Sequence, residues 1–375
     1  MARTTGLKIL RGHACGWNIS DITSTGHKPE NSMPNYDDVP MSTISLKHIQ
    51  DRAGLLSPHV VETPSVEFSS PRLSPLLGGG SLFLKLESLQ KTGTFKARGA
   101  LSRAMAIPES DRHLGITAAS AGNHAIAAAW AANHIGVSAK VVMMGSANPY
   151  RVARAKMLGA DVVMMGGGSE AMNEAERLER DENRTYIHPF EGPFTTLGAA
   201  GVGLEFATQV PDMDAVVVAV GGGGLISGVS AAIKQLNPKC AIYGVEPEGA
   251  NSMQQSFAAG HAVALDGINT LADSLGAPSA MPFSYRVCRE FVDEIVTVND
   301  DQICAGVVLY QEEAKLAVEP AAGAALAAVF GPLRARLQGK RIGVVVCGAN
   351  IDAASYVKIL ARGQGDVQAL LAPDA

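Results

Sequence analysis

Charged and aromatic residues are both scarce in this sequence. Of its 375 residues, 18% are Asp, Glu, Lys or Arg and 5% are Phe, Trp or Tyr, and the net charge is −5. No basic cluster interleaved with aromatic residues is found, which argues against nucleic acid and anionic membranes as partners. One long stretch without charges, residues 215–233, contains five glycines. It therefore predicts a strand, a loop and a helix rather than a membrane span.

Cysteine is also rare, and the five cysteines are scattered along the chain without CxxC spacing. This distribution predicts a reducing compartment. The first residues carry positive charges but no apolar segment of the kind found in secretory signal peptides. We therefore expect a cytoplasmic protein.

Apolar residues, at 47%, and 40 glycines are what the sequence has in abundance. A chain of this length and composition can bury a large core, as α/β enzymes with a parallel sheet do. Residues 1–40 lack periodicity and are expected to form an extension. From residue 41 on, apolar strand segments alternate with alanine-rich helical segments, which predicts a parallel sheet covered by helices on both faces. The expected strands are 82–86, 140–144, 161–165, 215–220, 241–245 and 342–346, and the expected helices include 44–50, 123–133, 151–158, 227–235 and 321–337.

A lysine at the expected start of a helix is the first candidate for chemistry. Residues 81–86 are typical of a strand, Gly93 of a turn, and Lys96 falls in the first turn of the next helix. The neighbouring Phe95 and small residues can partly exclude water from the ammonium group, and the helix N-terminus is positive. Both effects lower the pKa of a lysine, as an amine that attacks a carbonyl requires. A solvated surface lysine is the alternative, since most lysines at helix starts have no catalytic role.

Four consecutive glycines, Gly221, Gly222, Gly223 and Gly224, stand between an apolar strand and an apolar helix. Residues without Cβ let several backbone N–H groups converge on one small anion at the positive end of the helix. A tight turn alone needs only one or two glycines. The spacing matches neither the dinucleotide-binding GxGxxG pattern nor a P-loop. We therefore expect a phosphate site for a cofactor with a single phosphate group.

A third run, residues 117–125, leads into an alanine-rich helix. Ser120, Asn123 and His124 lie close to the expected helix N-terminus, where side chains and free N–H groups can together bind a carboxylate. A serine N-cap followed by an asparagine turn explains the same residues. From the spacing alone, both interpretations stay open.

Together these runs identify a family. The sequence resembles the fold-type II pyridoxal-phosphate enzymes, most closely the branch of serine/threonine dehydratases (threonine ammonia-lyases) and serine racemases. The resemblance covers about residues 42–365 and rests on six runs in the family's order: 85–100, 120–124, 188–190, 221–224, 318–323 and 346–350. It implies an α/β fold like that of the tryptophan synthase β-subunit, with two three-layer domains built on parallel or mixed sheets. We expect a large cofactor-binding domain formed by 41–114 and 192–375, and a small domain, 115–191, inserted in it.

The resemblance also implies roles for single residues. Lys96 would form a covalent imine with the cofactor aldehyde, and Gly221, Gly222, Gly223 and Gly224 would bind its phosphate. Phe95 would pack on the pyridine ring, Asn123 would hydrogen-bond the ring hydroxyl, and Cys347 would be the neutral partner of the ring nitrogen. The segment expected to receive the substrate carboxylate is Ser120, Ala121, Gly122, Asn123 and His124. Glu319, which precedes a proline at an expected helix start, would lie near the cofactor.

A neutral partner of the ring nitrogen makes the ring a weaker electron sink, which favours prompt β-elimination. The expected reaction is therefore dehydration and deamination of a β-hydroxy amino acid, such as L-threonine or L-serine, to a 2-oxo acid and ammonium, with Lys96 as general base. Racemases of this family carry a serine where this sequence has Ala121, and a methyl group cannot donate a proton. An amino-acid racemase, or a protein that binds cofactor and amino acid without turnover, is the alternative. The family's Ala-Asp-Gly run is Ala272-Asp273-Ser274 here, which points to a changed environment for the substrate.

A divalent cation site is a further question. The segment that corresponds to the family's Mg²⁺ or Ca²⁺ ligands contains Glu246 and the carbonyl of Ala250, but Ser252 replaces a carboxylate, which weakens binding. A strand end followed by an exposed acidic loop is the alternative. We expect a homodimer or homotetramer that acts on a small amino-acid substrate.

Overall fold

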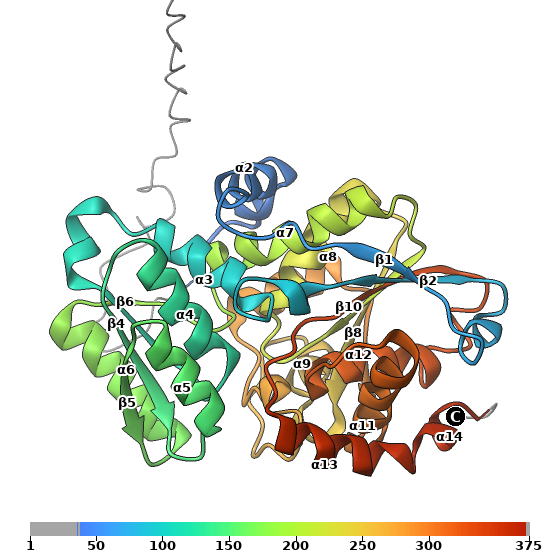
Figure 1. Cartoon of the computed structure of the whole chain (residues 1–375). Helices are drawn as coiled ribbons and strands as arrows, with labels where there is room; N and C mark the ends of the chain where they lie inside the picture. Colours follow the sequence, from blue (N-terminus) through green and yellow to red (C-terminus); the bar gives the residue numbers. More distant parts are fainter. Residues whose placement is uncertain (1–35, 37, 373–375) are drawn as a thin grey trace, which may run out of the picture.

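The computed structural model describes Tyr36 and residues 38–372, which form two parts that lie side by side, each built around one β-sheet (Figure 1). The larger sheet has six strands in the order β1-β2-β10-β7-β8-β9. β1 and β2 pair antiparallel, and all other neighbours in this sheet pair in parallel. The strands are β1 (Ser65–Phe68), β2 (Ser81–Lys85), β7 (Ala215–Ala219), β8 (Ala241–Pro247), β9 (Glu294–Val298) and β10 (Arg341–Val345).

The smaller sheet has four parallel strands in the order β5-β4-β3-β6. Its two faces bury different apolar clusters, because successive residues of β4 point to opposite sides. Val141 and Met143 pack with the alanines of helix α4, whereas Val142 packs with helix α6. The strands are β3 (Ile116–Ala119), β4 (Ala139–Met144), β5 (Asp161–Met165) and β6 (Thr185–Tyr186).

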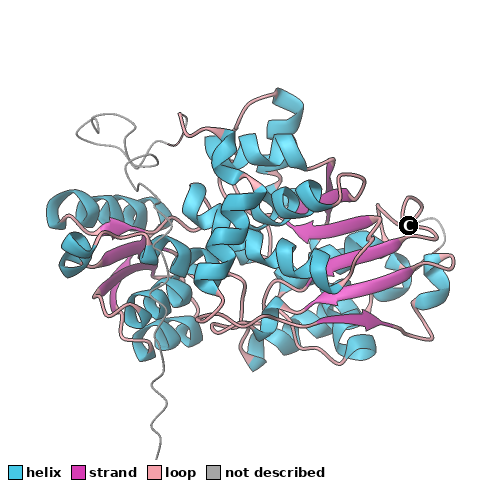
Figure 2. Cartoon of the chain, turned by 90° about the horizontal axis from the view of Figure 1, so that it is seen from above, coloured by secondary structure: helices cyan, strands magenta, loops and turns pink. Residues whose placement is uncertain are grey.

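Helices flank both sheets, so each part has three layers (Figure 2). On the larger sheet, α8 and α12 lie on opposite faces, with α7 packed on α8 and α11 on α12. Within the described part of the chain, no helix combines the length and apolarity needed to cross a lipid bilayer. The α-helices are α2 (Leu46–Leu56), α3 (Lys96–Met105), α4 (Asn123–His134), α5 (Pro149–Met157), α6 (Gly168–Glu182), α7 (Pro193–Gln209), α8 (Gly224–Leu236), α9 (Ser252–Ala259), α10 (Pro282–Phe291), α11 (Asp300–Leu309), α12 (Pro320–Phe330), α13 (Ala353–Gln364) and α14 (Val367–Leu370).

Short 3₁₀ turns join several of these elements, and one π-helical turn, η7 (Tyr310–Ala314), follows α11. The 3₁₀ turns are η1 (Met41–Ile44), η2 (Ser74–Leu77), η3 (Glu87–Leu89), η4 (Glu109–Leu114), η5 (Glu248–Ala250) and η6 (Asp273–Leu275).

The predicted α/β fold class is confirmed, and all six expected strands are present within two residues of their predicted ends. The helix expected at 321–337 is too long: α12 ends at Phe330, because Gly331 and Pro332 follow and the residue before a proline disfavours helical geometry. β1, β3, β6 and β9 were not expected. Most of the predicted extension, residues 1–35 and 37, lies outside the described residues. The domain boundaries near residues 41, 115 and 192 stay predictions.

A buried network of ion pairs fixes the start of α3, which lies between the two parts and packs on both α4 and α7. Lys85, the last residue of β2, pairs with Glu205 of α7 at 2.7 Å. Arg98 of α3 pairs with Glu87 at 2.8 Å and with Glu205 at 2.6 Å. Two cations and two carboxylates balance one another, as buried charges require. The network therefore anchors the helix turn from which Lys96 projects.

Candidate active site

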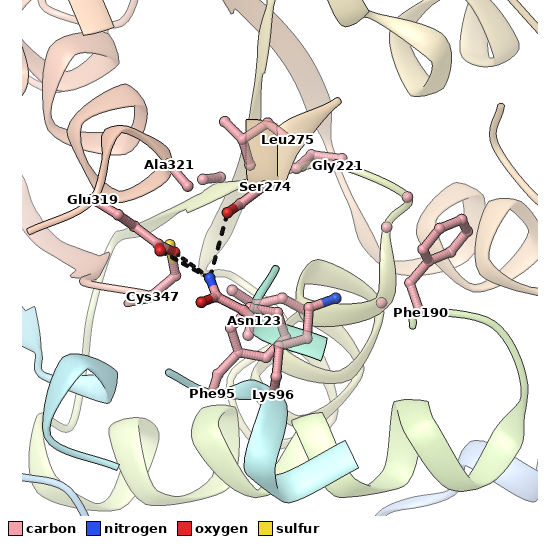
Figure 3. A pocket seen from close by; sticks show the side chains of 16 residues that line it. Phe95, Lys96, Asn123, Phe190, Gly221, Ser274, Leu275, Glu319, Ala321 and Cys347 are labelled. Carbon is pink, nitrogen blue, oxygen red and sulfur yellow. Dashed lines mark hydrogen bonds between the residues drawn. The ribbon is translucent and has the colours of Figure 1, made fainter. Parts of the chain in front are cut away.

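Lys96 projects into a cavity where α3, α4, the glycine run and the ends of β7 and β10 meet (Figure 3). As predicted, it is the first residue of α3. Its Nζ donates a hydrogen bond to the carbonyl oxygen of Pro189 at 2.7 Å and lies 5.1 Å from the ring centroid of Phe95. Burial lowers the pKa of Lys96 to about 8, although Cys347 and Glu319 act in the opposite direction. A substantial fraction of the amine is therefore neutral near physiological pH.

The glycine run forms the wall of the cavity opposite α3. β7 ends at Ala219, one residue before its expected end, and α8 begins at Gly224, three residues before the expected helix start. Gly223 has φ of +91°, which disfavours residues with a side chain. A Cβ on Gly224 would lie 2.7 Å from the backbone carbonyl oxygen of Phe190, so this position has no room for one. The run stands at the positive end of α8, where backbone N–H groups attract anions.

Cys347, which follows β10, and Glu319 lie on another side of the cavity. Burial raises the pKa of the Cys347 thiol well above its ordinary value, so the group is neutral. Glu319 is the N-cap residue of α12, but its side chain does not cap that helix. Both its carboxylate oxygens instead accept hydrogen bonds from Asn123 Nδ2 at 2.8 Å, and burial raises its pKa.

Asn123 stands in the middle of the cavity, with Phe95 and Lys96 on one side and Ser274 on the other (Figure 3). Its Nδ2 also donates to Ser274 Oγ at 3.4 Å. Its Oδ1 accepts a hydrogen bond from Asn350 Nδ2 at 3.0 Å. Partners on both ends of the amide fix its orientation.

The segment 120–124 leads into α4, but Ser120 is not the N-cap. Gly122 takes that position, and Ser120 Oγ accepts a hydrogen bond from the Gly122 N–H at 3.1 Å. The interpretation of Ser120 as a helix cap is therefore wrong. Asn123 and His124 are buried, whereas Ser120 and Ala121 are half-buried. The carboxylate-binding role of this segment stays a prediction.

Two histidines beside the cavity are held neutral. Burial lowers the pKa of His124 and of His188 to about 3. His124 Nε2 lies 2.7 Å from the carbonyl oxygen of Ile187, and His188 Nδ1 accepts a hydrogen bond from the Glu191 N–H at 2.8 Å. Neither ring is a proton donor at neutral pH, whereas Lys96, with a pKa of about 8, exchanges a proton in that range.

The expected metal ligands lie away from this cavity, around the start of α9. Glu246 lies near the end of β8, is buried and accepts hydrogen bonds from the N–H groups of Met253 at 2.9 Å and Gln254 at 2.8 Å, whereas Glu248 in the following turn is exposed. Burial raises its pKa to about 8. Ala250 and Ser252 are also buried. Within Tyr36 and residues 38–372, no three His, Cys, Asp or Glu residues are grouped so as to hold a metal ion. The Mg²⁺ or Ca²⁺ site stays a prediction.

Three residues of the site were not singled out from the sequence. Phe190 covers the glycine run, Asn350 binds Asn123, and Arg151 of α5 packs against the 120–124 segment, where a Cβ on Gly122 would lie 2.9 Å from Arg151 Nη1. Phe190 and Asn350 belong to runs that carry the family resemblance, which was a usable signal. Arg151 had none.

A family model described as "Pyridoxal-phosphate dependent enzyme" matches residues 56–348. The chain belongs to this family. Among its relatives, a phenylserine dehydratase of Ralstonia pickettii is 44% identical over 326 residues, which cover 86% of this chain and 99% of the relative. An L-threonine ammonia-lyase of Thermotoga maritima is 37% identical over 321 residues, 85% of this chain and 79% of the relative.

Solved structures agree with this assignment. The structure of maize serine racemase superimposes with a TM-score of 0.79 at 32% identity and covers 86% of this chain and 98% of the racemase. The family resemblance and the fold expected from it are thus confirmed.

Enzymes of this family use pyridoxal phosphate, and the residues of the cavity fit that cofactor. The glycine run at the start of α8 leaves the space and the N–H groups that a phosphate needs. Lys96 offers an amine with a pKa of about 8 to an aldehyde. The neutral thiol of Cys347 and the ring of Phe95 line the same cavity.

Proposed function

We propose that this enzyme catalyses dehydration and deamination of a β-hydroxy amino acid, such as L-threonine or L-serine, to a 2-oxo acid and ammonium. The observation that carries the proposal is the placement of Lys96, a lysine with a pKa of about 8, in one cavity with the glycine run and next to a segment that contains Ala121. The relatives support it, because phenylserine and threonine are both β-hydroxy amino acids.

Each residue of the cavity has a proposed task. Gly221, Gly222, Gly223 and Gly224 would hold the cofactor phosphate. Phe95 would pack on the cofactor ring, Asn123 would hydrogen-bond its hydroxyl group, and Cys347 would be the neutral partner of its nitrogen. When bound, pyridoxal phosphate supplies an electron sink that stabilises negative charge at the substrate Cα.

The start of α4 would bind the substrate carboxylate. Free N–H groups and the side chains of Ser120 and Asn123 receive the carboxylate, helped by the positive helix end. The neutral state of His124 leaves that anion to the backbone and to the two side chains.

Lys96 is the group that moves the proton. Its neutral amine removes the proton from the substrate Cα, and the substrate hydroxyl leaves from Cβ as water, so that the substrate loses the Cα hydrogen and the Cβ hydroxyl together as one molecule of water. Addition of water to the unsaturated product releases ammonium and the 2-oxo acid. A return of the proton to the opposite face of Cα would give a racemase, but Ala121 supplies no donor there, so elimination is favoured over racemisation.

Two further properties stay predictions from the sequence. We expect the enzyme to be cytoplasmic and to assemble as a homodimer or homotetramer. Neither affects the chemistry proposed for the cavity.

The test is a product assay on the purified enzyme loaded with pyridoxal phosphate. L-Threonine, L-serine and β-phenylserine are offered separately, and 2-oxo acid, ammonium and the D-amino acid are measured. We expect equal amounts of 2-oxo acid and ammonium, and no product from the Lys96→Ala variant. D-amino acid in excess of 2-oxo acid would establish a racemase instead. A cofactor absorbance that shifts on adding amino acid without any product would establish a binding protein.

A further inference from the structure

Five residues form a closed circuit of hydrogen bonds between the two parts of the molecule. Asn123 donates to Ser274 at 3.4 Å, and Ser274 Oγ donates to Asp273 Oδ1 at 3.3 Å. Arg151 binds the Asp273 carboxylate through Nη1 and Nη2. Nε and Nη2 of Arg151 also donate to the backbone oxygen of Asn350, each at 3.2 Å, and Asn350 Nδ2 returns to Asn123 Oδ1 at 3.0 Å.

The circuit connects elements that belong to different sheets. Asn123 begins α4 and Arg151 lies on α5, both of which pack on the smaller sheet. Asp273 and Ser274 form η6, and Asn350 lies in the loop after β10 of the larger sheet. Every bond from Arg151 to this circuit therefore crosses from one part to the other.

Arg151 is buried more deeply than its partner. Its side chain is 7% exposed, whereas that of Asp273 is 60% exposed. A guanidinium group loses its hydration on burial and needs acceptors in return. Asp273 and the Asn350 carbonyl are those acceptors, and Glu319 adds a more distant carboxylate at 3.9 Å. The same guanidinium packs against Gly122, within the segment expected to receive the substrate carboxylate.

We propose that Arg151 is a positioning residue that holds the 120–124 segment and the Asn123 amide in register with the larger sheet. It does so through Asp273 and Ser274 at one end of the amide and through Asn350 at the other. Loss of Arg151 removes the support of Ser274 at one end and of Asn350 at the other, and leaves Glu319 as the remaining partner of Asn123 Nδ2. The inference rests on the proposed function only for its kinetic consequences, since the orientation of Asn123 toward the cofactor can be followed without substrate.

The experiment compares four single variants and one double variant, Arg151→Met with Asp273→Asn, of the holoenzyme with the wild type. Arg151→Lys keeps the charge but not the two-pronged geometry, and Arg151→Met removes both. Asp273→Asn breaks the ion pair at its exposed end, where little destabilisation is expected. Arg154→Met is the matched control, because Arg154 lies on the same helix and binds the Tyr150 hydroxyl of that helix. The readouts are the visible circular dichroism of the bound cofactor, its dissociation constant, kcat and KM, and the urea midpoint.

We expect Arg151→Lys and Asp273→Asn to change the cofactor dichroism and to lower kcat/KM by about tenfold or more, because misplacement of a binding segment by a fraction of an ångström is costly. KM should account for most of this loss, since Arg151 packs on the carboxylate segment. The effects of Arg151→Met and Asp273→Asn should not add in the double variant, because both break one circuit. Arg154→Met should resemble the wild type.

Wild-type dichroism and kcat/KM in both Arg151→Lys and Asp273→Asn would overturn the proposal, as would effects that multiply in the double variant. If Arg151→Met fails to fold, the other two variants still decide the matter. If the wild type releases no 2-oxo acid, the proposed function is wrong, but the dichroism of the same variants still tests the role of Arg151.

Discussion

The pKa of Lys96 predicts how fast the protein without cofactor captures pyridoxal phosphate at different pH values. Only a neutral amine attacks an aldehyde, so the rate follows the deprotonated fraction of Lys96. Burial lowers that pKa from 10.5 to about 8. The rate should therefore rise about tenfold per pH unit up to pH 8 and level off above it.

The magnitude separates a buried lysine from a solvated one. At pH 8, about half of an amine with a pKa of 8 is neutral, against about 0.3% of an ordinary lysine, a ratio of about 150. The assay mixes the apoprotein with pyridoxal phosphate from pH 6 to pH 10 and follows the absorbance of the bound cofactor. The reference is the rate at which Nα-acetyl-lysine, which has a free ε-amine, captures pyridoxal phosphate at each pH. Dividing the two rates removes the effect of the titration of the cofactor itself.

Replacement of Glu319 tests the electrostatic part of the argument. The Glu319 carboxylate raises the pKa of Lys96 by stabilising the ammonium form. Glu319→Gln should therefore shift the midpoint of the capture rate below that of the wild type. A wild-type midpoint near 10.5 would refute the reasoning, because it would mean that the ammonium group is fully hydrated in the cavity.

Three more predictions concern the glycine run, the buried ion pairs and the histidines. Gly224→Ala forces a Cβ to within 2.7 Å of backbone, so overpacking of about 1–3 kcal/mol should weaken cofactor binding about tenfold or more in a fluorescence titration, whereas Gly54→Ala, with nothing within 4 Å, should not. Arg98→Met leaves Glu87 and Glu205 without their shared cation and should lower the free energy of unfolding in urea by about 3–5 kcal/mol, against less than about 1 kcal/mol for Arg362→Ala in an exposed pair. The folded protein holds His124 neutral with a pKa of about 3, below the 6.5 of an unfolded histidine. The contribution of His124 to the free energy of unfolding is therefore most favourable above pH 6.5 and falls by about 2 kcal/mol from pH 7 to pH 5, because the histidine gains a proton in the unfolded chain and not in the folded protein. His124→Gln should flatten that slope in urea unfolding, and an unchanged slope would assign the acid sensitivity to other groups.

The features that the sequence predicted well are those whose cause is local. The strand that ends before Gly221 and the helix that starts at Gly224 are neighbours along the chain, so their meeting needs no knowledge of the rest of the fold. Lys96 was predicted for the same reason, since Gly93 and the preceding strand determine where the helix begins. The strands β3 and β6 were not predicted, because they have only four and two residues, too few for an alternation of apolar and polar residues to be recognised. β9, with its Ile-Val-Thr-Val run, carried a signal that could have been used.

The polar partners of the site have a different origin. Glu319 was expected at a helix start, where a carboxylate usually interacts with the helix dipole. Its side chain binds Asn123 instead, a residue 196 positions earlier in the chain, because a buried carboxylate needs hydrogen-bond donors and the Asn123 amide supplies them. No local sequence pattern predicts this contact between Glu319 and Asn123.

The burial of Arg151 could not be predicted from its local sequence either. The sequence of α5 around Arg151 is typical of a solvent-exposed helix face. Arg151 is buried because η6 and the loop after β10 contact its side chain. A charge buried by distant segments costs free energy unless those segments supply acceptors, and Asp273 and the backbone oxygen of Asn350 supply them to Arg151. The positions that could not be predicted from the sequence are therefore those that connect the two parts of the molecule. A loss of kcat/KM in Asp273→Asn with an unchanged urea midpoint would show that this connection serves the chemistry, whereas a lower urea midpoint with unchanged kcat/KM would show that it serves the fold alone.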